Sequence, residues 1–192
     1  MFHHGATLPA LLLGIGALFV WGVDAGDVLR YERTAILDGA VWRLLTGHLV
    51  HLNGYHLGWN LAGLTVVWAL CGRALPTAAW RRITLLCATG ISLCLLVLSP
   101  VIAWYEGLSG LLHGWLVAGS IANLMAGLRI DGGVMLAVLT AKLLFEQWHG
   151  PLGSSMLMTK GPIVVDAHLY GALSGIMAVW LETNIQKKRS KS

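Results

Sequence analysis

A serine between two glycines is the first feature of this sequence that could do chemistry. The stretch "GLSGLLHG", residues 107–114, places Ser109 one helical turn before His113. A serine hydroxyl becomes a useful nucleophile when a base accepts its proton, and a neutral imidazole can do this near pH 7. Such a small-residue stretch more often serves helix packing in a membrane. Catalysis at Ser109 would therefore need a base and oxyanion donors from elsewhere in the chain.

Candidates for both roles occur before and after this stretch. His168 is the candidate base, while His56 and Asn60 are four residues apart and so share a helix face. Their N–H groups, with the backbone N–H of Ser109 at a helix start, could stabilise an oxyanion. Asp166 lies two residues before His168, and residues with this spacing point to different sides of a helix. We therefore interpret Asp166 as an acid or cap at the outer end of a helix. The lesser alternative is that Asp166 orients His168 as a third member of the site.

The composition indicates an integral membrane protein with one domain, residues 1–192. The chain is 56% hydrophobic and 11% charged, with a mean hydropathy of +0.70. Soluble domains carry about 25% charged residues, so a water-facing surface is excluded. The net charge of +4 comes from clustered basic residues, which indicates membrane topology and no nucleic-acid partner. Three cysteines, without a pairing pattern, argue against a disulfide framework.

Six apolar stretches predict an all-α bundle of six transmembrane helices. About 20 helical residues, with a lower limit of about 17, cross the hydrocarbon layer, and only helices satisfy the backbone there in a bundle of this kind. The first stretch lacks a preceding basic residue and a cleavage site, so we expect it to be a retained helix rather than a signal peptide. The predicted spans are 8–23, 55–72, 82–103, 107–126, 133–148 and 163–182.

The distribution of basic residues favours both termini in the cytoplasm. With this orientation eight Lys and Arg residues lie on the inner side, four on the outer side, and Lys142 within a span. The first outer loop, about 24–54, is long, and we expect one or two short helices at the interface, with Trp42 near the headgroups. The basic tail, 183–192, is expected to anchor the orientation.

This topology brings the candidate residues to one depth. Ser109 falls near the outer end of the fourth span, His168 near the outer end of the sixth, and His56 with Asn60 at the outer end of the second. Because ionisable groups in membranes are costly and usually functional, this agreement favours a site in the outer third of the bilayer.

Glycine spacing predicts that two of these helices pack closely. Gly110 and Gly114 form one GxxxG pair, and Gly171 and Gly175 form another on much the same face as His168. Small residues at this spacing let helix backbones approach one another. The Ser109 hydroxyl and the His168 ring could then reach hydrogen-bond distance, about 2.6–3.2 Å.

In order and spacing, four motifs resemble the rhomboid intramembrane serine proteases over about residues 40–182. They are "WR" at Trp42, "HLNGYHLGWN" with His56 and Asn60, "GLSG" with Ser109, and "AHLYGALSG" with His168. The resemblance implies a six-helix core and a dyad in which Ser109 is the nucleophile and His168 the general base. It also implies that His56, Asn60 and the Ser109 amide form the oxyanion site.

The same resemblance implies supporting roles for other residues. Trp42 and Arg43 match a structural motif of the first loop, and His51 matches a histidine that braces this loop. Gly107, Gly110, Gly171 and Gly175 belong to the structural motifs. Where many bacterial rhomboids carry a tyrosine one turn after the serine, this chain has His113, whose ring could stack on the His168 imidazole.

The sequences of the motifs and the small size of the chain are most similar to those of the rhombosortase subfamily. This similarity implies substrates that are single-span bacterial surface proteins with a glycine-rich C-terminal anchor, a Gly-Gly motif followed by a transmembrane helix and a basic end. It implies cleavage by water or transfer to a lipid-derived amine, in the inner membrane of a Gram-negative bacterium, with the site open to the periplasm. No cofactor and no metal are implied.

Three alternatives remain at the level of sequence. The nearest is a non-catalytic rhomboid-like protein that binds membrane helices. A haem or metal site could draw on His48, His51, His56, His113 and His168, although HExxH is absent and no tight cluster with a carboxylate is visible in the sequence. A small transporter is disfavoured because the chain shows no inverted repeat.

Overall fold

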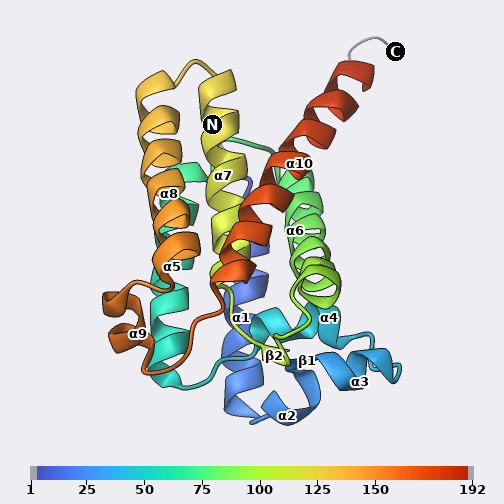
Figure 1. Cartoon of the computed structure of the whole chain (residues 1–192). Coiled ribbons are helices and arrows are strands. Elements are labelled where there is room, and N and C mark those ends of the chain that lie inside the picture. The colour runs from blue at the N-terminus through green and yellow to red at the C-terminus, as the bar shows by residue number, and fades with distance from the viewer. Residues whose placement is uncertain (1–3, 190–192) are drawn as a thin grey trace.

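The computed structural model describes residues 4–189, and its framework is a bundle of six long helices (Figure 1). Each long helix overlaps one of the six apolar stretches, so the predicted all-α bundle is confirmed. The helices are α1 (Thr7–Gly22), α5 (Gly54–Cys71), α6 (Thr77–Leu98), α7 (Ser109–Met125), α8 (Arg129–His149) and α10 (Val165–Arg189).

Short elements gather at one end of the bundle. The first loop contains α2 (Gly26–Leu29), α3 (Arg33–Leu37), α4 (Arg43–Thr46) and the 3-10 turn η1 (Gly47–Leu49), more than the one or two helices predicted. Strand β1 (Tyr31–Glu32) pairs antiparallel with β2 (Trp104–Tyr105), just before α7, and so joins the loop to that helix. Helix α9 (Gly153–Thr159) was not predicted and lies beside α5 (Figure 1).

Helix α7 is the central helix of the bundle. It packs against α5, α6, α8 and α10, and in Figure 1 it lies between α8 and α10. Most of its residues are buried, among them Trp115, whose ring packs on that of Trp80 at a centroid distance of 4.9 Å. The residues next to Ser109 are buried in protein at the start of α7, which explains why the helix can begin with a polar residue.

Four glycines set the close approach of α7 to α10. A Cβ atom on Gly110 would lie 2.8 Å from the Ala167 carbonyl oxygen, and one on Gly114 would lie 2.7 Å from that of Gly171. A Cβ on Gly171 or Gly175 would collide with the carbonyl groups of Gly110 and Gly114. The predicted contact of the two GxxxG faces is therefore confirmed, and it brings the first turns of both helices together.

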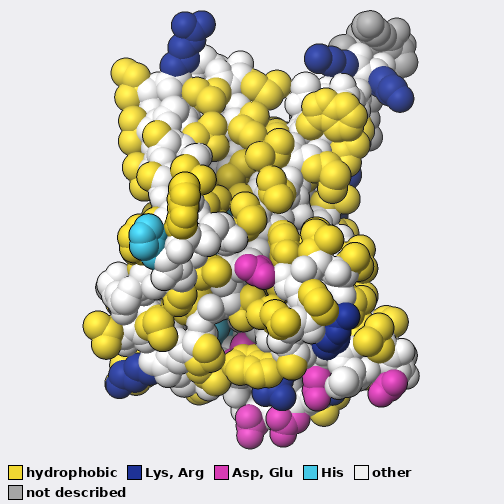
Figure 2. All heavy atoms as spheres, in the orientation of Figure 1, with side chains coloured by type: hydrophobic (Ala, Val, Ile, Leu, Met, Phe, Trp, Pro, Cys, Tyr) yellow, Lys and Arg dark blue, Asp and Glu magenta, His cyan; other side chains and the backbone are white. Residues whose placement is uncertain are grey.

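The surface of the long helices is apolar. Figure 2 shows hydrophobic side chains covering their length, with charged groups mainly at the two ends of the molecule. Phe19, Val97 and Trp180 are 67%, 71% and 62% exposed, which suits contact with lipid better than contact with water. By length and composition alone, only α6 among the described residues is long and apolar enough to cross a membrane, while α1 is apolar but shorter.

Two helices differ most from their predicted bounds, α6 and α10. Pro76 is extended rather than helical, so α6 begins directly after it, at Thr77. The helix ends at Leu98, and both ends lie about five residues before the predicted bounds. Helix α10 continues past residue 182 into the predicted tail and ends at Arg189. The buried Glu182 carboxylate accepts two hydrogen bonds from Arg82, at 2.8 and 2.6 Å, which holds these two helices together.

Gly171→Ala tests the close approach of α7 and α10. Because the added methyl has no space, we expect a loss of about 1–3 kcal/mol in the free energy of unfolding, the range for overpacked cores. Gly133→Ala in α8 is the matched control, since a Cβ there meets no atom within 4 Å. Thermal unfolding in detergent micelles measures both variants. Equal melting temperatures for the two would contradict the packing described for α7 and α10.

Candidate active site

Ser109 and His168 lie in contact at the end of the bundle that carries the short elements. Ser109 is the first residue of α7 and His168 lies in the first turn of α10. The distance from Ser109 Oγ to His168 Nε2 is 3.0 Å, within the predicted range. The histidine is 4% exposed, so water does not compete freely for its ring. A hydroxyl and an imidazole at this distance can exchange a proton.

The pair faces a cavity of about 390 Å³ between α5, α7, α8 and α9. Its walls are largely apolar and include Trp59, Leu112 and Leu139. His56 and Asn60 also line it. A mostly apolar cavity with a few convergent polar groups is typical of a site that binds part of a substrate.

Gly107 places the His56 ring beside the start of α7. Its φ is +109°, a conformation that favours glycine, and a Cβ there would lie 2.7 Å from His56 Nε2. The Tyr105 hydroxyl donates to the Gly107 carbonyl at 2.8 Å and fixes this turn. The Asn60 amide donates to the His56 carbonyl at 3.0 Å, so one of its two N–H groups remains for other acceptors.

His113 stacks on His168, as the resemblance implied for this position. The two rings are 4.2 Å apart and nearly parallel, with an interplanar angle of 12°. His113 Nδ1 lies 2.7 Å from the Ser109 carbonyl oxygen, one turn earlier in α7. The stacking and this hydrogen bond hold the His168 ring against the serine.

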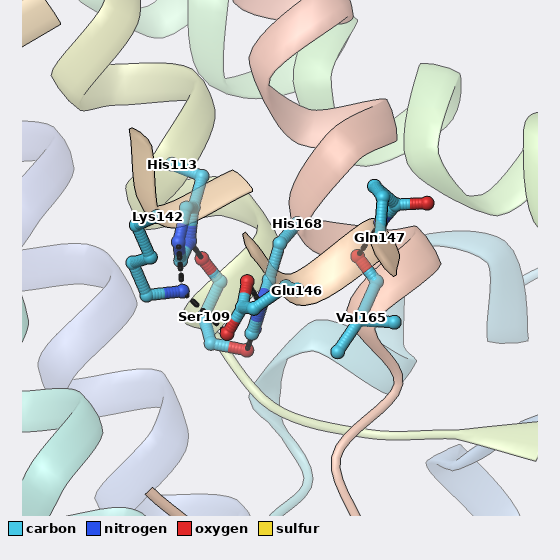
Figure 3. A network of polar contacts seen from close by, with 7 residues as sticks. All are labelled: Ser109, His113, Lys142, Glu146, Gln147, Val165 and His168. Carbon is cyan, nitrogen blue, oxygen red and sulfur yellow. Dashed lines mark hydrogen bonds and ion pairs between the residues drawn. The ribbon is translucent and has the colours of Figure 1, made fainter. Parts of the chain in front are cut away.

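Helix α8 adds two residues that the sequence reasoning missed (Figure 3). Glu146 Oε2 lies 2.9 Å from His168 Nδ1, and the carboxylate is 1% exposed. Lys142 Nζ lies 2.7 Å from Glu146 Oε1 and 3.0 Å from His113 Nε2. The signal was present in the sequence, because an oppositely charged pair four residues apart within an apolar stretch marks a shared, buried helix face.

A model of the rhomboid domain matches residues 38–184 of this chain, which is most of its length. The chain belongs to the rhomboid family. It is therefore an integral membrane protein of a family of intramembrane serine proteases, which act on transmembrane substrates within the bilayer. A search of curated proteins finds no match. The resemblance seen in the motifs is thus confirmed at the level of the family, and rhombosortase remains a prediction.

The first loop of this rhomboid is held by the predicted Trp42–Arg43 motif. Arg43 donates to the backbone carbonyls of Arg30 and Asp27, each at 2.8 Å, and Trp42 Nε1 donates to that of Val28 at 3.2 Å. These bonds tie α4 to α2 and to the segment before β1. Their partners are backbone atoms of the loop, so the motif shapes the loop and does not touch the cavity.

Two histidines of the loop region are structural neighbours of the site. His51 packs edge-on against His56 at a centroid distance of 5.1 Å, and its Nδ1 lies 3.0 Å from the Leu49 carbonyl oxygen. Burial lowers the pKa of His51 to about 4, so it is neutral at pH 7. His48, a candidate ligand at the level of sequence, instead contacts the carbonyl of Ala88 on α6 at 3.0 Å.

Two expectations about carboxylates change in the folded rhomboid. Asp166 accepts a hydrogen bond from Ser99 Oγ at 2.5 Å, and the ring of His168 faces Glu146 instead, so the lesser alternative for Asp166 is wrong. The expected lack of a tight cluster with a carboxylate is also wrong. His113, Glu146 and His168 offer ligand atoms within 4.8 Å of one another. The Lys142 ammonium already lies between two of these groups and supplies a positive charge there.

Gly107→Ala tests whether the turn before α7 shapes the site. The new methyl must displace the His56 ring, so we expect labelling of the protein by a fluorophosphonate probe to slow by about 100-fold or more, the effect of losing one oxyanion donor. Gly127→Ala is the control, because its φ is +89° but a Cβ there meets no atom within 4 Å. Both variants should lose stability, by about 1–3 kcal/mol for the strained φ. Equal labelling rates would contradict the role of this turn.

Proposed function

We propose that this rhomboid cleaves the anchor region of membrane proteins with Ser109 as nucleophile and His168 as general base. The observation that carries the proposal is the 3.0 Å contact between Ser109 Oγ and His168 Nε2 at the edge of the substrate-sized cavity. In the first step, the Ser109 proton passes to Nε2 while Oγ attacks a substrate carbonyl carbon. The protonated His168 then gives this proton to the leaving amine, and an acyl-enzyme remains.

The developing oxyanion would be stabilised by three donors. Leu52 N–H points at His56 Nδ1, at a long 3.4 Å, which favours the tautomer with a proton on Nε2, beside Gly107. Asn60 has a second amide N–H, and the backbone N–H of Ser109 lies in the first turn of α7, where such groups lack partners within the helix. One preorganised donor of this kind contributes about 2.7–4 kcal/mol to transition-state stabilisation in serine proteases.

The orientation that we propose has both termini in the cytoplasm and the site near the outer face. Ser109 and His168 lie in the first turns of their helices, at the end of the bundle where the first loop lies, and the C-terminal end of α10 lies at the other end (Figure 1). Figure 2 shows Lys and Arg side chains at both ends of the molecule. Along the sequence, eight of these residues fall on the side of the second end and four on the side of the first loop, and this difference supports a cytoplasmic second end under the positive-inside rule. With it we propose a bacterial inner membrane and a site open to the periplasm.

The substrates that we propose are single-span bacterial surface proteins with a Gly-Gly motif at the outer end of a C-terminal anchor helix, as in rhombosortases. A transmembrane helix must unwind locally before its backbone can reach a nucleophile. Glycine is about 0.8–1.0 kcal/mol less favourable than alanine in a helix, so a Gly-Gly pair lowers the free energy of unwinding. The acyl group then passes to water, or to a lipid-derived amine in a transfer reaction.

Substitution of the dyad tests the enzyme assignment. Ser109→Ala and His168→Ala should each reduce fluorophosphonate labelling and substrate cleavage by at least about a thousandfold, because serine and histidine act as a unit in such enzymes. Ser120→Ala in α7 and His149→Ala in α8 are matched controls away from the cavity and should retain both activities. Undiminished labelling of the Ser109→Ala protein would remove this residue from the role.

Substrate variants test the glycine requirement. Replacing Gly-Gly by Ala-Ala at the outer boundary of a single-span substrate should slow cleavage about 15- to 30-fold, the effect of 1.6–2.0 kcal/mol of added helix stability. The same replacement at the inner end of that helix is the control and should change little. Mass spectrometry of the released passenger separates hydrolysis from transfer. Equal rates for both substrates would contradict the proposed substrate class.

A further inference from the structure

A closed ring of polar contacts begins and ends at Ser109 (Figure 3). It runs from the Ser109 carbonyl oxygen through His113, Lys142, Glu146 and His168 to the Ser109 hydroxyl. The carbonyl and carboxylate oxygens of the ring only accept hydrogen bonds, and the ammonium group only donates them. Each nitrogen of a neutral histidine either donates or accepts, depending on the tautomer. The proton positions can therefore be assigned along the ring. The following argument rests on the proposed roles of Ser109 and His168.

The backbone carbonyl of Ser109 fixes the tautomer of His113. A carbonyl oxygen only accepts, so His113 Nδ1, at 2.7 Å, carries a proton. In the neutral ring, Nε2 then has a lone pair, and Lys142 Nζ donates to it at 3.0 Å. The stacked histidine therefore serves as an acceptor that holds the lysine in place.

The lysine in turn provides the charge that Glu146 needs. The Glu146 side chain is fully buried, and an isolated carboxylate in an apolar interior would take up a proton. The Lys142 ammonium, 2.7 Å from Oε1, favours the ionised form. The two charges cancel, so the ring as a whole is neutral while the His113 and His168 rings are neutral.

An ionised Glu146 fixes the tautomer of His168. Its Oε2 only accepts, so His168 Nδ1, at 2.9 Å, must carry the proton. The lone pair is then on Nε2, which faces Ser109 Oγ at 3.0 Å. Without the carboxylate, the proton could move to Nε2, and the ring would no longer accept a proton from the serine. This is the tautomer loss by which an amide in place of the triad carboxylate disables serine proteases.

We propose that Glu146 is a positioning residue that makes the dyad a triad, and that Lys142 holds Glu146 ionised. Both residues act through His168, because Glu146 touches its ring and Lys142 touches Glu146. When His168 takes the serine proton on Nε2, its Nδ1–H still donates to the Glu146 carboxylate. The negative charge of this carboxylate then stabilises the positively charged ring. Glu146 and Lys142 both lie on α8, so this helix contributes to a reaction that takes place between Ser109 on α7 and His168 on α10.

Glu146→Gln tests this role with a substrate cleavage assay. We expect kcat to fall about 100- to 10,000-fold with KM within a few-fold, as for loss of the correct tautomer in other triads. Glu146→Asp keeps the charge and should retain more activity than the glutamine variant. The matched control is Glu182→Gln, which also removes a buried, paired carboxylate, on α10 beside Arg82. It should lower the melting temperature but leave kcat unchanged.

Lys142→Gln gives a second arm. It should lower kcat in the wild-type background and add at most a few-fold loss in the Glu146→Gln background, because both substitutions act through one contact. The inference is overturned if Glu146→Gln retains wild-type kcat while Ser109→Ala is inactive. It is also overturned if Glu146→Gln and Glu182→Gln lose kcat equally. If Ser109→Ala itself remains active, the proposed function fails instead.

A measurement on the unmodified protein keeps the inference testable even if Glu146→Gln does not fold. Nitrogen NMR of 15N-histidine-labelled protein in micelles, with the His168 signals assigned by their loss in His168→Gln, reports which ring nitrogen carries the proton. We expect a protonated Nδ1 and an unprotonated Nε2. A proton on Nε2 at the same pH would contradict the role of Glu146.

Discussion

The contact between Ser109 and His168 depends on how closely two helix backbones can approach. Side chains larger than hydrogen on the shared faces of α7 and α10 would separate the helices, because Gly110 and Gly171 already bring backbone atoms into contact. The hydroxyl and the imidazole project from the first turns of these helices, so their 3.0 Å separation follows from that approach. Two other elements contact the surroundings of this pair. The turn at Gly107 places His56 beside the start of α7, and α8 places Glu146 against the His168 ring.

Polar groups in an apolar bundle require partners, and here the partners also determine the chemistry. In lipid, an unpaired donor or charge is costly, so each group of the ring around Ser109 is matched to a group of opposite character. The same matching leaves the lone pair of His168 Nε2 toward the serine. A requirement of stability in a membrane thus selects one tautomer of the proposed base, His168. Away from the site, Arg82 and Glu182 satisfy the same requirement without contact to the cavity.

Several features of the fold and the site could be predicted from the sequence because they depend on spacing along one helix. The GxxxG pairs, the shared face of His56 with Asn60, and the position of His113 one turn after Ser109 are of this kind. The apolar stretches located six helices for the same reason. The bounds of α6 were missed because hydropathy does not register the extended backbone of Pro76. Hydropathy also does not register that Glu182 of α10 pairs with Arg82, so that the helix starts before this charged residue and not at it.

The partner of His168 could not be predicted because it comes from a third helix. Asp166 is the carboxylate nearest to His168 in sequence, but it accepts a hydrogen bond from Ser99. Glu146 instead contacts the His168 ring from α8. The spacing of Lys142 and Glu146 marks a charged face within an apolar stretch, but the residue that this face meets is set by tertiary packing. Helix α9 escaped prediction because seven residues are too few to show a helical period.

The most direct measurement is a crystal structure of this rhomboid after reaction with a small fluorophosphonate. The account predicts a phosphorus atom bonded to Ser109 Oγ, with the phosphoryl oxygen within hydrogen-bond distance of His56 Nε2 and the Asn60 amide, and His168 still stacked on His113. A phosphorus atom bonded to another residue, or an adduct on Ser109 whose phosphoryl oxygen points away from both donors, would contradict it.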